Sequence, residues 1–138
     1  MKYKILLINP DDTALKKELH DLNARGMNVV GATNVEDACQ FLKEDGLIHA
    51  VLTEWEVPVT HDGEFVLKGA ELFAEFLMLR SEVNLFLYSS QANLPYRNTG
   101  GELNGYFYKK EHDYDDIVRK VRSEVINSKN RAPFFEKL

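Results

Sequence analysis

The chain has 138 residues, of which 44% are hydrophobic and 28% charged, and its formal net charge is −5 at pH 7. This size and composition predict one globular domain, and the acidic balance argues against a nucleic-acid partner. The single cysteine, Cys39, excludes an intrachain disulfide and falls in an apolar helical pattern, where we expect it to pack as a small hydrophobic side chain.

No apolar run reaches the length of a membrane-spanning helix. The apolar N-terminal segment is too short for a signal peptide, and it is followed by Asn-Pro-Asp-Asp instead of a small-residue cleavage site. We therefore expect no membrane partner and a cytoplasmic location.

The first half of the chain alternates apolar runs with segments of helical periodicity. We expect strand, helix, strand, helix and strand over residues 3–9, 12–25, 27–32, 35–45 and 47–54. Asp11, Asp12 or Thr13 can cap the first helix, and Asn34 can cap the second. The last of these strands is apolar at nearly every position, which is typical of a central parallel strand.

The second half begins with an irregular stretch, residues 55–69, which is longer than a usual loop between a strand and a helix. A helix, a strand, a turn-rich segment, a strand and a helix are then expected over residues 67–81, 83–90, 91–101, 103–109 and 114–128. Asp113 can cap the last helix. We interpret residues 1–128 as the domain and residues 129–138 as the start of a linker to a following domain.

Strands that alternate with helices predict an α/β fold with right-handed crossovers. The expected architecture is a doubly wound five-stranded parallel sheet in the order 2-1-3-4-5. Functional groups in such sheets gather beyond the carboxyl ends of the strands. The polar residues that the sequence places at or near those ends are Asp11, Asp12, Glu54, Ser89 and Lys109.

Sequence motifs of common catalytic and cofactor sites are absent. The chain has no glycine-rich phosphate loop, no histidine pair at metal-ligating spacing and no G-x-S-x-G turn. We therefore predict no catalytic, cofactor-binding or metal-binding residues.

Three segments at the predicted strand ends resemble the phosphorylation pocket of response-regulator (CheY-like) receiver domains. They are LTEWEVP, LYSSQA and GYFYKK, at residues 52–58, 87–92 and 105–110. In this resemblance Glu54 stands where an aspartate accepts phosphate, Ser89 where a hydroxyl senses it, and Lys109 where the family has an invariant lysine. Tyr106 falls at the switch-aromatic position. The resemblance spans residues 3–128 and implies a flavodoxin-like, receiver-like three-layer sandwich.

The same pocket departs from the receiver pattern at the residues that carry phosphoryl transfer. The carboxylate of Glu54 lies one methylene further out than that of aspartate, which spoils the geometry of attack. The two acids that hold Mg²⁺ should fall at Asn9 and Pro10. Asp11 and Asp12 come one or two residues late, so we expect no strong magnesium site and no phosphorylation. Glu54 can imitate part of the phosphate charge by pairing with the receiver-type lysine, or it can stay solvated.

Two groups of residues near the C-terminus fit a narrower pattern. They are Glu111, Asp115 and Ile117, and then Pro133, Phe134 and Phe135. This pattern is similar to the junction that follows the N-terminal receiver-like (wing) domain of bacterial PLP-dependent ornithine/lysine/arginine decarboxylases. The resemblance implies a non-catalytic domain that serves oligomer assembly or regulation and uses its tail to contact the following domain. PLP would belong to the parent enzyme, and this segment would hold no cofactor.

Three functions therefore remain open from the sequence. The chain can be the wing domain of a decarboxylase, with its own downstream domain or further copies as partners. It can be a stand-alone pseudo-receiver that signals through protein contacts around Tyr96, Tyr106 and Tyr108. It can also be a phosphorylatable receiver with an unusual acceptor.

Overall fold

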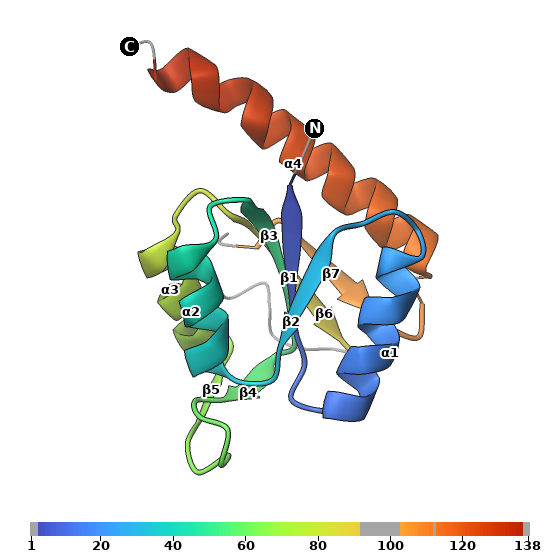
Figure 1. The fold of residues 1–138 in the computed structure, drawn as a ribbon, viewed down its shortest axis with the longest axis vertical. Coiled ribbons are helices and arrows are strands. Elements are labelled where there is room, and N and C mark those ends of the chain that lie inside the picture. Colours follow the sequence, from blue (N-terminus) through green and yellow to red (C-terminus); the bar gives the residue numbers. More distant parts are fainter. Residues whose placement is uncertain (1–2, 92–102, 112, 137–138) are drawn as a thin grey trace.

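A five-stranded parallel sheet lies at the centre of the computed structural model, which describes residues 3–91, 103–111 and 113–136. Its strands, in the spatial order β2-β1-β3-β6-β7, are Val29–Ala32, Lys4–Ile8, Ile48–Thr53, Asn84–Ser89 and Gly105–Tyr108. All neighbouring pairs run parallel. The order confirms the predicted doubly wound sheet, whose carboxyl ends meet at one edge (Figure 1).

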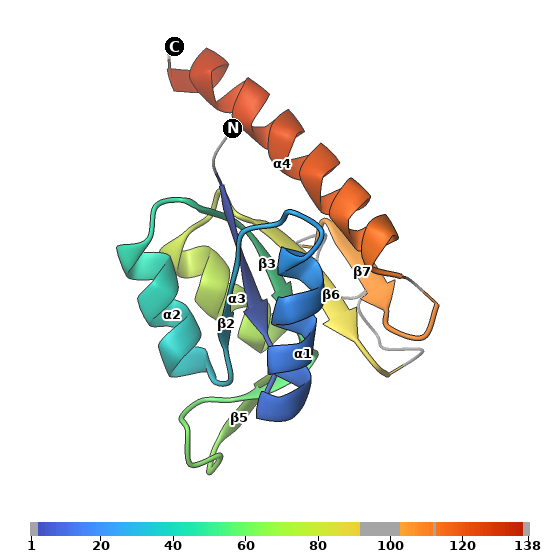
Figure 2. The same cartoon turned by 45° about the vertical axis from the view of Figure 1, so that its right-hand side comes forward.

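Helices cover both faces of this sheet (Figures 1 and 2). Helices α1 (Asp12–Asn23) and α4 (Tyr114–Glu136) lie on one face, and α2 (Val35–Glu44) and α3 (Ala70–Leu79) lie on the other. Successive residues of a strand point to opposite faces, so each strand contributes to two cores. Leu7 of β1, for example, packs in the core under α1 and α4, while Leu6 packs in the core under α2 and α3.

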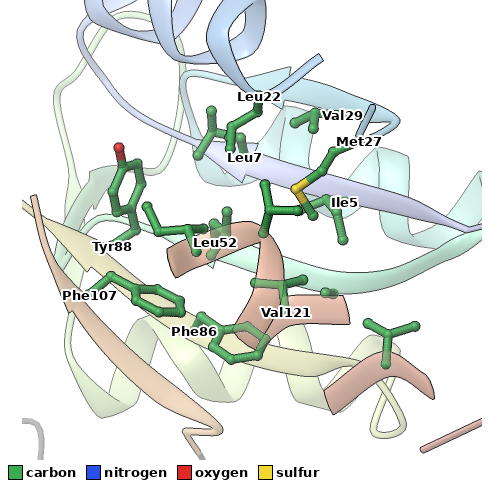
Figure 3. Close-up of a cluster of buried hydrophobic side chains, with 14 of the residues drawn as sticks. Ile5, Leu7, Leu22, Met27, Val29, Leu52, Phe86, Tyr88, Phe107 and Val121 are labelled. Carbon is green, nitrogen blue, oxygen red and sulfur yellow. The ribbon is translucent and has the colours of Figure 1, made fainter. Parts of the chain in front are cut away.

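The core under α1 and α4 is built largely from aromatic and branched side chains (Figure 3). Phe86 and Phe107 stack with ring centroids 5.6 Å apart, on the adjacent strands β6 and β7. Val121 of α4 and Leu22 of α1 are fully buried against the same sheet face. Burial of this apolar surface is the main force that holds both helices on the sheet.

Three predicted capping residues are confirmed. Asp11 accepts a hydrogen bond from the Ala14 amide at 3.2 Å, and Asn34 accepts one from the Asp37 amide at 2.8 Å. Asp113 accepts one from the Asp116 amide at 2.9 Å. Each cap satisfies a backbone donor that the first turn of a helix leaves without an intrahelical partner.

The stretch predicted to be irregular, residues 55–69, contains an antiparallel hairpin. Its strands are β4 (Glu56–Pro58) and β5 (Val66–Lys68). That part of the prediction was wrong because strands of three residues are too short to show an alternating apolar pattern. Asp62-Gly63, a frequent turn pair in hairpins, is the one sequence signal at its tip.

The last helix is longer than predicted. It was expected to end at residue 128, but α4 continues to Glu136 and extends past the sheet (Figures 1 and 2). Lys129, Arg131 and Ala132 have high helix propensity, and Pro133 removes one backbone donor without ending the helix here. The interpretation of residues 129–138 as the start of a linker stays a prediction.

Some predicted features lie outside the part that the structure describes. The turn-rich segment with Tyr96 falls mostly in residues 92–102, and the side chains of Pro133, Phe134 and Phe135 are likewise not described. Cys39 is half-buried and packs against the core under α2 and α3, as expected. Within the described ranges, no helix has both the length and the apolarity needed to cross a bilayer.

Candidate functional site

A pocket of about 420 Å³ lies at the carboxyl edge of the sheet. Of the residues predicted to gather there, Asp11, Glu54, Ser89 and Lys109 line it. Asp12 does not line it, because it lies exposed on the first turn of α1, with its carboxylate 3.1 Å from Lys16 Nζ. The structure therefore brings together four of the five predicted pocket residues.

Tyr106, at the predicted switch-aromatic position, lies on β7 and is half-buried. Its ring packs against the core under α2 and α3, and its hydroxyl donates a hydrogen bond to the carbonyl oxygen of Gln91. Gln91 lines the pocket. Tyr106 thus links β7 to the segment that follows β6 at the pocket wall.

The pocket holds a buried ion pair between Lys109 and Glu18, a residue of α1 that was not predicted to belong to the site. Lys109 Nζ lies 2.6 Å from Glu18 Oε2 and 3.6 Å from Glu54 Oε2. It also lies 4.4 Å from the centroid of the Tyr88 ring, a favourable position for a cation. The pairing of Glu54 with Lys109, which the sequence left open, is therefore present at ion-pair distance, but Glu18 is the closer partner.

Asn9 completes the surroundings of Glu18. Its Nδ2 donates to Glu18 Oε1 at 2.9 Å, and its Oδ1 accepts from the Asp11 amide at 3.0 Å. The Glu18 side chain is only 8% exposed, yet each carboxylate oxygen has a partner. A buried carboxylate with both oxygens satisfied forms a rigid arrangement.

The sequence contained a signal for Glu18 that the prediction did not use. In α1, Leu15 and Leu22 are buried, and Glu18 lies three residues after the first and four before the second. Residues at this spacing share one face of a helix. An acid on the apolar face of a helix that covers a sheet needs a cation, and Lys109 is the nearby lysine at the end of β7.

Glu54 has a less complete environment than Glu18. Its backbone amide donates to the carbonyl of Ile8 at 3.2 Å, which aligns it with the end of β1. Its Oε1 is buried and has no hydrogen-bond partner among the described residues. Burial raises the pKa of the Glu54 carboxyl, and the charge of Glu18 adds to the rise, whereas Lys109 and the Ser89 hydroxyl oppose it.

This raised pKa leads to a prediction about pH. Because the folded protein holds the Glu54 proton more tightly than the unfolded chain, Glu54 contributes most stability below its ordinary pKa of 4.5. That contribution is lost as pH rises through the folded-state pKa. From about pH 4 to pH 7, the protein should therefore lose stability relative to Glu54→Gln, which cannot titrate. Urea unfolding of both proteins at several pH values measures the difference.

Asp45 provides a control of opposite sign. A 2.7 Å hydrogen bond from Lys4 holds the pKa of Asp45 below its ordinary value of 3.8. Its contribution to stability is therefore present above that value and lost as pH falls. The free energies of unfolding of Asp45→Asn and of the unmodified protein should thus differ less under acidic conditions. If the free energies of unfolding of Glu54→Gln and the unmodified protein change with pH in parallel, the environment assigned to Glu54 is wrong.

In this pocket, side chains that could offer oxygen atoms to a magnesium ion already have partners within the protein. Mg²⁺ requires octahedral oxygen ligands, usually including carboxylates. Here the Asn9 amide is bound to Glu18 and to the Asp11 backbone, and Oδ1 of Asp11 caps α1. The ammonium group of Lys109 lies within ion-pair distance of the carboxylates of both Glu18, which is buried, and Glu54, which is half-buried. Among the described residues, no three acids, histidines or cysteines are grouped as metal ligands would be.

The sequence matches no family model and no curated protein. Solved structures match it over nearly its full length. A CheY-like response regulator receiver domain protein from Methanospirillum hungatei JF-1 has a TM-score of 0.76 at 17% identity, with 96% of this chain and 100% of that chain covered. A signal receiver domain of an HD domain-containing protein from Pseudomonas fluorescens Pf-5 has a TM-score of 0.77 at 16% identity, with 94% of this chain and 99% of that chain covered.

A third similar structure is the response regulator protein TrrA from Thermotoga maritima in complex with Mg²⁺ and BeF. Its TM-score is 0.69 at 18% identity, and the match covers 88% of this chain and 97% of that chain. At such identities the similarity concerns the fold alone. The chain therefore has the flavodoxin-like fold of receiver domains, as the sequence predicted.

Proposed function

We propose that this chain is a pseudo-receiver: a receiver-fold domain that acts through contacts with other proteins and does not take up a phosphoryl group. The observation that carries this proposal is the buried pair of Lys109 with Glu18, which Asn9 supports. A phosphoryl group that entered the pocket would have to draw Lys109 away from Glu18. Because Glu18 is buried, leaving it without its cation would be strongly unfavourable.

The acceptor position supports the same conclusion. Phosphoryl transfer needs a carboxylate oxygen aligned with the incoming phosphorus and counter-ions for the charge that develops. Glu54 has one oxygen buried without a partner, and burial disfavours its charged form. The residues that would have to hold a magnesium ion are engaged in other hydrogen bonds.

Exposure to acetyl phosphate and Mg²⁺ tests this proposal. We expect no mass gain of a phosphoryl group, and we expect no change in the amide resonances of Glu54, Ser89 and Lys109 when Mg²⁺ and beryllofluoride are added. The TrrA domain of Thermotoga maritima, whose structure contains Mg²⁺ and BeF, serves as the control under the same conditions. A phosphoryl adduct on Glu54, or saturable shifts centred on the pocket, would refute the proposal.

The second candidate is the N-terminal domain of a PLP-dependent ornithine/lysine/arginine decarboxylase, in which the same non-phosphorylated domain would serve oligomer assembly or regulation. It is supported by the sequence resemblance of residues 105–138, including Pro133, Phe134 and Phe135. It is also compatible with the extension of α4 past the sheet (Figure 1). In either case the domain itself would have no enzymatic activity and no cofactor.

The coding sequence downstream of Leu138 separates these two candidates. A reading frame that continues into a Ser-x-His-Lys segment of the kind that binds PLP would favour the decarboxylase. A stop codon directly after Leu138 would exclude it and leave the stand-alone pseudo-receiver.

A further inference from the structure

We propose that the β4–β5 hairpin and the acidic surface beside it form a docking site for a basic segment of a partner protein that also carries an apolar side chain. This inference rests on the proposed function, since it names the surface and the kind of partner through which the domain would act. It concerns the surface beside the pocket around Lys109, with which it shares Asp11 and Glu56.

Two consecutive apolar residues of this hairpin have exposed side chains, which an extended strand directs to opposite faces. Phe65 is 68% exposed and Val66 is 45% exposed, at the turn and the start of β5. The exposed ring of Phe65 leaves apolar area in water, at about 25 cal/mol for each Å². A partner that covers this area gains that free energy, so such patches often mark contact sites.

Hydrogen bonds hold the backbone that carries these side chains in a defined conformation. Across its strands the Val59 amide donates to the Phe65 carbonyl at 2.7 Å. At its turn Asp62 Oδ1 accepts from the Thr60 hydroxyl at 2.6 Å and from the Glu64 amide at 3.1 Å. Little conformational entropy would then be lost when a partner binds.

The base of the hairpin is attached to the domain at two further points. The Glu36 amide at the start of α2 donates to the Val59 carbonyl at 2.9 Å, and the Gly69 amide donates to the Trp55 carbonyl at 3.0 Å. Between them Val57 of β4 is fully buried. The exposed tip is therefore carried by a segment that is packed against the body of the domain.

Exposed carboxylates lie on the hairpin and on the helix starts beside it, and they define the charge of the partner. The hairpin, the start of α2 and the cap of α1 lie at the same end of the molecule (Figures 1 and 2). The contacts agree with this arrangement, because the Glu36 amide donates to the Val59 carbonyl of the hairpin, and Asp11 and Glu56 line the same pocket. The exposed acids of these three segments are Asp11, Glu36, Asp37, Glu56, Asp62 and Glu64.

Lys68 is the only lysine or arginine in the hairpin, residues 56–68. The surface is therefore complementary to lysine and arginine side chains. A second copy of the chain would bring the same carboxylates together, which costs energy, and nucleic acid or an anionic membrane would be repelled. A basic segment with an apolar anchor is the partner that satisfies both the charge and the exposed Phe65.

A short synthetic peptide of lysine and leucine at amphipathic helical spacing is the probe for this site, added to the ¹⁵N-labelled full chain. We expect amide shifts centred on residues 56–68 and 36–37. Phe65→Ser should weaken binding about tenfold, as for a central anchor of an interface. Glu64→Lys should also weaken binding, and added salt should do so as well. Circular dichroism shows whether each variant stays folded.

Matched variants elsewhere on the surface provide the controls. Met78→Ser removes an apolar side chain that is 84% exposed on α3, and Glu44→Lys reverses an exposed charge at the end of α2. Neither should change the affinity. A peptide of glutamate and leucine should not bind, and a peptide of lysine and serine should bind much more weakly than the lysine–leucine peptide.

Several results would overturn the proposal. They are equal binding of the lysine–serine peptide, undiminished binding to Phe65→Ser, shifts centred on another face, and self-association of the free chain that Phe65→Ser abolishes. A phosphoryl adduct on Glu54 together with peptide binding at the hairpin would refute the proposed function and leave the docking site intact.

Discussion

Replacing Lys109 by methionine is expected to lower the free energy of unfolding by about 3–5 kcal/mol. Methionine keeps most of the apolar stem but removes the ammonium group, which lies 2.6 Å from Glu18 and 3.6 Å from Glu54. Glu18 would then be a buried carboxylate whose remaining partner in this site is the amide of Asn9. Urea unfolding followed by circular dichroism measures the loss.

Four further variants, one of them Glu18→Gln alone, identify the cause of that loss. Lys109→Met combined with Glu18→Gln should be more stable than Lys109→Met alone, because the amide carries no charge that needs a cation. Lys109→Met combined with Glu54→Gln should recover less of the lost stability, since Glu54 is the more distant partner of Lys109. Lys110→Met, at an exposed neighbouring position, should change stability by no more than about 0.5 kcal/mol. Additive effects of Lys109→Met and Glu18→Gln would show that the two side chains do not interact.

Much of the fold could be predicted because its determinants are local. The apolar runs that became β1, β3 and β6 are bounded by polar residues and turns, and strict alternation with helices left few topologies. Asn34 shows how local such a signal can be, since its side chain caps α2 by a bond to an amide three residues away. The hairpin could not be predicted by the same means, because each of its strands has three residues and pairs with partners 8 to 12 residues away.

The candidate site could be predicted only in part, for a related physical reason. The positions of Glu54, Ser89 and Lys109 follow from the strand ends, so strand assignment was enough to bring them together. Glu18 comes from a helix, and whether its side chain reaches Lys109 depends on how α1 packs on the sheet. The charge state of Glu54 likewise depends on its depth and on Glu18, neither of which a strand pattern contains.

Gly69 is the second position where one substitution should have a large effect. It precedes α3 and joins it to the hairpin, with φ 60° and ψ −135°, a conformation that side chains with a Cβ rarely adopt. A Cβ there would lie 2.9 Å from two ring carbons of Trp55. Trp55 packs edge-on against Phe73, with ring centroids 6.0 Å apart, so it has little room to move.

Gly69→Ala should therefore lower the free energy of unfolding by about 3 kcal/mol, through backbone strain and overpacking together. Trp55 is the only tryptophan in the sequence, so its fluorescence reports both the unfolding and any displacement of the ring. Two other glycines separate the two causes. Gly63 has φ 75° but open space around it, so Gly63→Ala should cost about 1 kcal/mol from the backbone alone.

Gly46 has open space and no left-handed φ, so Gly46→Ala should change stability very little. If Gly69→Ala costs no more than Gly63→Ala, the close contact with Trp55 is wrong. If it costs about 3 kcal/mol and also weakens binding of the lysine–leucine peptide in the remaining folded protein, then the Gly69–Trp55 contact positions the hairpin. The stability of the domain and the presentation of Phe65 would then depend on the same turn.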